Sequence, residues 1–112
     1  MEGAMVMTTS CGSREEADRI SAALVGERLA ACVQILPAMS VYRWQGAIER
    51  AEEHVLVIKT RAALAARVEA RVKALHSYEL PEFMGLAVVG GSSDYLAWIE
   101  AETRDGTAGS AL

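Results

Sequence analysis

The sequence predicts an α+β domain of the split βαβ type, with four strands, two helices between them and one extra C-terminal helix. Segments with the apolar pattern of strands and segments with helical spacing follow one another in the order strand, helix, strand, strand, helix, strand. The chain has 112 residues, 52% of them hydrophobic and 23% charged. This length and composition fit one domain with a two-layer core, and the chain is too short for two such domains. We expect residues 1–102 to form this domain and residues 103–112 to form a flexible tail.

The first strand is expected at residues 4–9, and the first helix follows it from about Arg14. Ser13 and Glu16 have the spacing of a capping box, in which each side chain accepts a hydrogen bond from the other residue's backbone N–H. Apolar residues then recur at helical spacing until Gly26, which weakens the last turn. The sequence therefore predicts an amphipathic helix that packs one face on a sheet.

The middle of the chain predicts a long hairpin. Residues 32–44 are rich in β-branched and aromatic residues, and a turn is expected at Gln45-Gly46 before the return strand. Pro37 has no backbone N–H to donate, so its strand is expected either at a sheet edge or to be broken there by a bulge. Residues 55–58 are apolar on both faces, which predicts a central strand.

The second half of the chain repeats the pattern. We expect a helix over about residues 61–75, a loop at 76–82 stiffened by proline, a fourth strand at 83–89 and a short helix at 94–102. Right-handed crossovers then place the first and third strands at the sheet centre and the second and fourth at its edges, the ferredoxin-like arrangement. Two helices on one face leave the other face exposed, and chains of this size usually cover such a face by self-association.

Charge and composition exclude several classes of protein. The formal net charge of −4 argues against a nucleic-acid partner and against an anionic membrane surface, since both require a basic field. We expect no membrane association, because the longest apolar strand-like run is far short of a bilayer span. No signal peptide pattern is visible, and Cys11 and Cys32 are expected to be free thiols. These observations predict a cytoplasmic protein.

Several motifs in fixed order resemble the CutA divalent-cation-tolerance proteins, over nearly the whole chain from about Val6 to Ile99. The segments that carry the resemblance are Arg28–Cys32, Pro37, Ser40–Glu49, Ile58–Thr60, His76–Glu82 and Tyr95–Trp98. The resemblance implies a homotrimer assembled through its sheet edges, similar in architecture to the PII signalling proteins. It also implies a cytoplasmic role in tolerance of copper and other divalent metals, and no agreed catalytic activity.

The resemblance further implies a copper(II) site at Cys11, His76 and Glu82. In the family, a Cys after the first strand and the His and Glu of the His-x-Tyr-x-x-Pro-Glu stretch have been proposed to hold copper. Thiolate, imidazole and carboxylate together suit Cu(II) or another borderline divalent metal, and no obligatory cofactor is expected. Two structural interpretations stay open: Cys11 as an inert loop thiol, and His76 as a favourable charge at a helix C-terminus.

Aromatic residues with polar tips form a second constellation, which in a trimer is expected to line a cleft between subunits. The residues assigned to this intersubunit cleft are Tyr42, Trp44, Glu49, Lys59, Tyr78, Tyr95 and Trp98. One interpretation is interface packing alone. The other is a pocket for a small anion or organic ligand, with Arg43 or Lys59 supplying charge and Glu49 or Glu82 orienting the ligand.

The function that the sequence favours is a homotrimeric protein of divalent-metal tolerance that binds copper(II) without catalysis. The alternative is a PII-like sensor that binds a small ligand in the intersubunit cleft. An enzyme is disfavoured because no nucleophile elbow or triad-like signature occurs. RNA binding is disfavoured because the strands lack paired aromatic and basic stacking residues.

Overall fold

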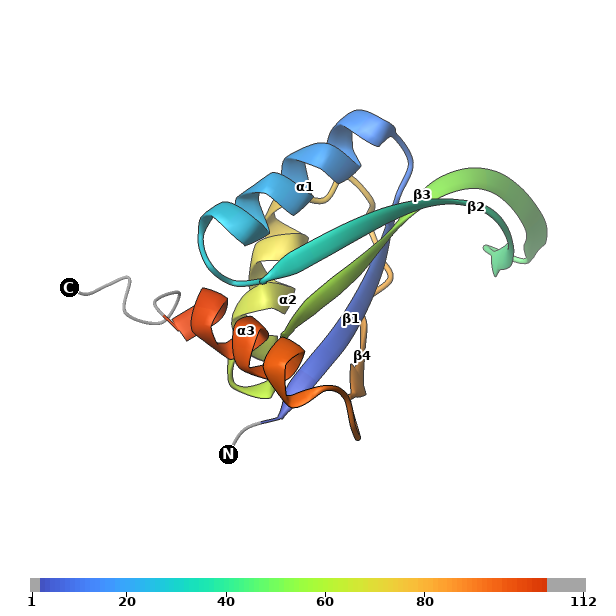
Figure 1. The fold of residues 1–112 in the computed structure, drawn as a ribbon. Coiled ribbons are helices and arrows are strands. Elements are labelled where there is room, and N and C mark those ends of the chain that lie inside the picture. The colour runs from blue at the N-terminus through green and yellow to red at the C-terminus, as the bar shows by residue number, and fades with distance from the viewer. Residues whose placement is uncertain (1–2, 105–112) are drawn as a thin grey trace.

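The computed structural model describes residues 3–104, which form one sheet and three α-helices (Figure 1). In chain order the elements are β1 (Ala4–Cys11), α1 (Arg14–Gly26), β2 (Cys32–Trp44), β3 (Ala47–Arg61), the short 3-10 helix Ala62–Leu64, α2 (Ala65–Leu75), β4 (Met84–Ala87) and α3 (Ser93–Thr103). The predicted α+β order with an additional C-terminal helix is confirmed.

The sheet is antiparallel, with strand order β2-β3-β1-β4. The two central strands are therefore β1 and β3, and the edges are β2 and β4, as the crossover rule predicts. Pro37 lies in β2 opposite His54, and the strand continues through it without interruption. Of the two expectations for this proline, the edge position is the one observed, because an edge strand tolerates a missing N–H donor.

The hairpin of β2 and β3 extends well beyond the rest of the sheet (Figure 1). β1 ends at Cys11, opposite His54, so that residues 47–53 of β3 pair with β2 alone. The turn holds two residues of positive φ, Gln45 at 51° and Gly46 at 85°, the pattern of a type I′ hairpin turn. The outer half of the hairpin is thus a two-stranded ribbon that projects from the domain.

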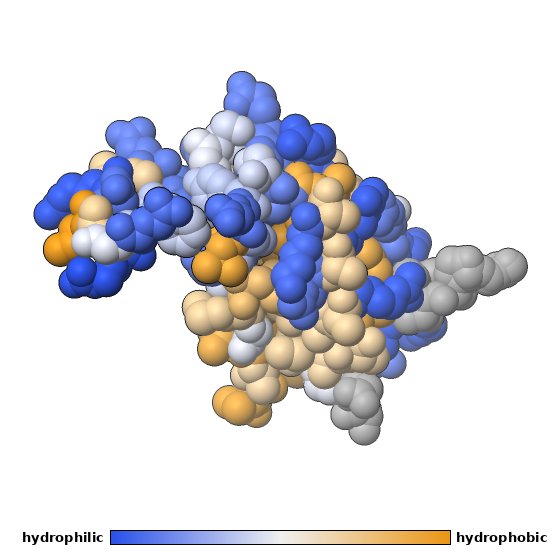
Figure 2. All heavy atoms as spheres, turned by 180° about the vertical axis from the view of Figure 1, so that it is seen from behind, coloured by the Kyte–Doolittle hydropathy of each residue, from blue (hydrophilic) through white to orange (hydrophobic). Residues whose placement is uncertain are grey.

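The core lies between one face of the sheet and helices α1 and α2. Its largest fully buried apolar side chains come from both layers: Ile20, Leu24, Leu56, Ile58, Leu64, Val68 and Val72. Helix α3 lies near the opposite face, where Lys59 Nζ sits 6.0 Å from the centre of the Tyr95 ring. Seen from behind, apolar side chains gather on the lower half of the body, whereas the projecting hairpin is largely hydrophilic (Figure 2).

Element boundaries differ from prediction by a few residues. Arg61, expected to begin the second helix, ends β3, and α2 proper starts at Ala65 after the 3-10 turn. β4 is shorter than predicted. Thr103, expected to begin the tail, is the last residue of α3, and its hydroxyl accepts a hydrogen bond from Arg61 Nε at 2.8 Å. Residues 105–112 of the predicted tail lie outside the described part. Within residues 3–104, no helix is long and apolar enough to cross a membrane.

Candidate metal site and the adjoining groove

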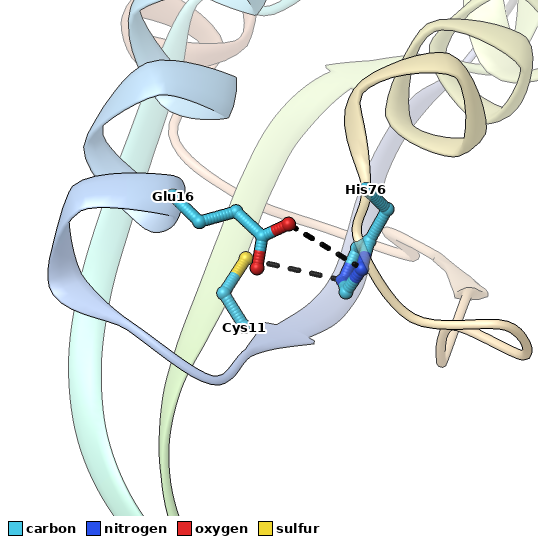
Figure 3. A group of neighbouring side chains, drawn as sticks. All are labelled: Cys11, Glu16 and His76. Atoms are coloured by element: carbon cyan, nitrogen blue, oxygen red, sulfur yellow. Dashed lines mark hydrogen bonds and ion pairs between the residues drawn. The ribbon is translucent and has the colours of Figure 1, made fainter.

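Three potential metal ligands meet where β1 ends: Cys11, Glu16 and His76 (Figure 3). Cys11 is the last residue of β1, Glu16 lies in the first turn of α1, and His76 directly follows α2. Their donor atoms all lie within 4.8 Å of one another. Residues 65 positions apart in the sequence are thus brought together by the packing of two helices against the end of one strand.

Glu16 does not play the role that the sequence predicts. The first half of the capping box is present, because Ser13 Oγ accepts the backbone N–H of Glu16 at 3.1 Å. The carboxylate, however, turns away from Ser13 and accepts the backbone N–H of Ser77 at 2.6 Å. It also lies 3.9 Å from His76 Nδ1, and the side chain is 6% exposed. Glu16 therefore joins the start of α1 to the loop after α2.

The His76 ring is fully buried and both of its nitrogens are engaged. Nε2 lies 2.7 Å from the backbone oxygen of Ser10, and Nδ1 accepts the backbone N–H of Tyr78 at 3.1 Å. A carbonyl oxygen can only accept, so Nε2 carries the proton and the neutral tautomer satisfies both bonds. The ring also packs 4.8 Å from the Tyr78 ring. His76 is therefore oriented from two sides, and no helix-dipole role is needed to explain its place.

The Cys11 thiol is buried, with Sγ 3.9 Å from His76 Nε2. Burial raises the pKa of this thiol to about 11; the negative charges of Glu16 and Glu53 act in the same direction, and Arg19 opposes them. Because the thiolate is the form that attacks and that binds metal, Cys11 is a poor nucleophile at neutral pH. A metal ion that binds here has to displace its proton.

The cluster matches a borderline divalent metal in donor type and spacing. It offers one thiolate, one carboxylate and one imidazole, a set suited to Cu(II) or Zn(II). Metal–ligand bonds of about 2.0–2.3 Å place two ligands of one ion within about 4.6 Å of each other. The Sγ to Nε2 distance of 3.9 Å meets this limit, and the three donor atoms, all within 4.8 Å of one another, are close to it. To ligate through Nε2, His76 gives up its bond to Ser10. Cys11, Glu16 and His76 would hold the ion, and its binding would release protons.

Glu82, predicted as the third ligand, is not brought to Cys11 and His76. Its two oxygens accept the hydroxyls of Thr8 at 3.0 Å and Ser10 at 2.8 Å. Side chains alternate across a strand, so Thr8 and Ser10 point to the face opposite Cys11. The carboxylate that completes the cluster in this structure is that of Glu16.

Six of the seven residues assigned to an intersubunit cleft fall into two groups within one chain, and Glu49 belongs to neither. Tyr42, Trp44 and Tyr78 line a groove of about 820 Å³ between the hairpin and the loop that precedes β4. Lys59, Tyr95 and Trp98 form the second group, in which the two aromatic rings stack at 5.5 Å. Glu49 lies opposite Tyr42 across the hairpin and is not among the groove residues.

Comparison with known proteins decides the family. The model of the family described as "CutA1 divalent ion tolerance protein" matches residues 5–102. The divalent-cation tolerance protein CutA of Thermus thermophilus is 42% identical over 104 residues, which cover 92% of this chain and 99% of the relative. The chain belongs to the CutA1 divalent ion tolerance family. The resemblance that the motifs indicated is therefore confirmed.

Two further relatives and two solved structures support the same assignment. The chloroplastic CutA proteins of Arabidopsis thaliana and Oryza sativa are 38% and 37% identical, and this CutA-family chain spans only 56% and 58% of their lengths. The crystal structure of CutA from Xylella fastidiosa has a TM-score of 0.88 and 44% identity, covering 90% of this chain and 98% of that one. The Thermus thermophilus structure has a TM-score of 0.87, 42% identity and coverage of 89% and 98%. None of these similarities supports a PII-like ligand sensor.

Sequence reasoning missed Glu16 as a member of the cluster. The capping-box pattern by itself explains a glutamate at this position, so the pattern gives no indication of a second role. The bond that Glu16 makes to Ser77 depends on the residue type at position 77. Unlike proline, serine has a backbone N–H, and this N–H is the group that the Glu16 carboxylate binds. This bond ties the loop after α2 to the start of α1.

Proposed function

We propose that this chain binds a divalent metal ion, with copper(II) as the leading candidate, at Cys11, Glu16 and His76, and that metal tolerance operates through this binding. The single observation that carries the proposal is the convergence of the three donor atoms within 4.8 Å. The donors differ in softness, which favours Cu(II) and Zn(II) over Mg(II) or Ca(II), both of which require all-oxygen sites.

We further propose that the site acts without catalysis. A thiol whose pKa is raised to about 11 is not activated for nucleophilic attack at neutral pH. Both nitrogens of His76 are held by backbone groups at 3.1 Å or less, so neither is poised to exchange a proton with a substrate. These features suit a binding site in which His76 is positioned in advance.

The proposal includes the cytoplasmic homotrimer that the family resemblance implies. In support, both sheet edges carry exposed apolar side chains, Leu36 on β2 and Met84 and Leu86 on β4, each half or more exposed. Exposed apolar edges of this kind favour association with further copies. Related proteins differ in compartment: that of Archaeoglobus fulgidus is called periplasmic and that of Arabidopsis thaliana chloroplastic. Light scattering with and without Cu(II) measures the assembly and shows whether metal changes it.

Calorimetric titration with Cu(II), and with Zn(II) because it does not oxidise thiols, tests the metal site. We expect His76→Ala, Cys11→Ser and Glu16→Gln each to weaken binding by about tenfold or more. Affinity is expected to rise with pH, because the Cys11 proton has to leave. Glu82→Gln is expected to bind as the natural chain does.

Two matched controls separate this site from adventitious binding. His54→Ala and Cys32→Ser remove the other imidazole and the other thiol of the chain, and both are expected to leave the affinity unchanged. Unchanged affinity in both His76→Ala and Cys11→Ser would exclude the cluster. A loss with Glu82→Gln but not with Glu16→Gln would instead indicate the ligand set that the family resemblance implies.

A further inference from the structure

The groove beside the hairpin is a second candidate binding site, distinct from the metal cluster. Its walls are the outer part of β2 and the loop before β4, and its volume is about 820 Å³. This volume is in the range of pockets that bind small organic molecules, and it is far larger than a metal ion needs. Its lining residues are Ser10, Ser40, Val41, Tyr42, Trp44, Glu53 and residues 78–84.

The charge of the groove is entirely negative. Three of its lining residues are glutamates, namely Glu53, Glu79 and Glu82, and within the described chain no lysine, arginine or histidine lines it. Arg43 and Lys59, the two residues expected from the sequence to supply charge to a ligand pocket, are not among the lining residues. A small anion is therefore excluded as the ligand by electrostatics.

Glu53 gives the groove a fixed and largely desolvated carboxylate. The residue is 9% exposed, and its two oxygens accept the hydroxyls of Ser40 at 2.6 Å and Tyr78 at 2.9 Å. No cationic side chain within residues 3–104 forms an ion pair with it. Burying an ionised carboxylate without an opposite charge is costly, and a cationic ligand would offset that cost.

The walls are aromatic as well as acidic. Tyr42, Trp44 and Tyr78 are each more than one third exposed, which leaves part of each ring accessible to a ligand. The faces of such rings attract cations, and the attraction is stronger where the cation is also partly desolvated. A carboxylate beside several aromatic rings is complementary to an organic cation in both charge and shape.

We propose that this groove binds a small organic molecule that carries a guanidinium or protonated amine, with Glu53 receiving the charged group and the aromatic rings flanking it. Guanidinium fits best, because its N–H groups can bond a carboxylate whose oxygens already accept one hydroxyl each. The site is separate from that of the proposed metal function, and neither proposal requires the other.

The test compares butylguanidinium with butylurea, a neutral molecule of nearly the same shape, by calorimetry on the full chain. Binding of butylguanidinium is expected to be about tenfold or more tighter and to weaken with added salt. Glu53→Gln, which keeps the side-chain shape, is expected to lose about tenfold, and Trp44→Leu several-fold. Glu15→Gln, an exposed carboxylate on α1, is the matched control and is expected to bind unchanged.

Equal affinity for butylguanidinium and butylurea would overturn the proposal, as would unchanged binding by both groove variants. Absence of butylguanidinium binding to the natural chain would overturn it as well. Circular dichroism of each variant identifies a loss that is due to unfolding, and Trp44→Leu provides the test if Glu53→Gln does not fold. Cu(II) titration of Trp44→Leu is expected to give the affinity of the natural chain, whereas Glu53→Gln also removes a charge that raises the pKa of Cys11.

Discussion

Replacing Cys11 with alanine is expected to reduce the loss of stability that this protein undergoes as the pH rises above neutrality. Burial raises the pKa of the folded thiol from 9.0 to about 11, with the charge of Glu16 as the second cause. Between these two values the unfolded chain has lost the proton and the folded chain still holds it. The unfolded state then binds fewer protons, so the free energy of unfolding falls as the pH rises.

The magnitude follows from the two pKa values. Over the full window from about pH 9 to pH 11, a shift of about two units corresponds to about 2.7 kcal/mol. Between about pH 8 and pH 10, a range that stays below the strongest alkaline effects on the rest of the chain, Cys11 accounts for about half of this, about 1.3 kcal/mol. Tyr78 also has its pKa raised, by burial and by its bond to Glu53, but it contributes equally with and without Cys11.

Urea denaturation in reducing buffer at these two pH values measures the effect. The natural chain is expected to lose about 1.3 kcal/mol more stability than Cys11→Ala between them, whatever the absolute cost of the substitution. Cys32→Ala, which changes the other thiol, is expected to keep the full loss. Equal losses in the natural chain and Cys11→Ala would refute the conclusion that a protonated, buried thiol is part of the folded cluster.

Two further substitutions test contacts around the same region and at the end of the chain. Gly12→Ala would place a Cβ 2.9 Å from the Tyr78 hydroxyl, so we expect the free energy of unfolding to fall by about 1–2 kcal/mol. Urea unfolding measures this change, and an unchanged stability would show that Tyr78 does not pack against Gly12. Thr103→Val removes the hydroxyl that accepts from Arg61 and donates to the backbone of Ile99. We expect a loss of about 1–3 kcal/mol, and an unchanged melting temperature would contradict the docking of α3 through this residue.

The fold was predictable because each of its decisive signals is local. Pro37, through its missing N–H donor, predicts either an edge strand or a bulge, and the structure shows the edge. Gln45-Gly46 predicts the hairpin turn through the positive φ that glycine permits. Ser13 is the N-cap of α1, and its capping bond to the backbone N–H of Glu16 is observed. Each of these signals depends on the backbone chemistry of one or two residues.

The candidate site was predictable only in part because its remaining members depend on tertiary packing. Whether Glu82 or Glu16 joins Cys11 and His76 is decided by the path of the loop after α2 and by which face of β1 each residue meets. The positions of Thr8 and Ser10 on the opposite face of β1 take Glu82 away from the cluster. No spacing in the sequence reports this, because Thr8 and Ser10 lie 74 and 72 positions before Glu82.

The metal cluster and the groove are joined by two residues that contribute to both. Ser10 receives His76 at its backbone oxygen and gives its hydroxyl to Glu82 in the groove wall. Tyr78 donates its backbone N–H to His76 and its hydroxyl to Glu53. A groove ligand that moves Tyr78 therefore changes the hydrogen bonding of His76. A metal ion that breaks the bond between His76 Nε2 and the Ser10 oxygen in turn affects the residue whose hydroxyl binds Glu82. If both sites bind, thermodynamic reciprocity requires each ligand to alter the affinity of the other by the same factor.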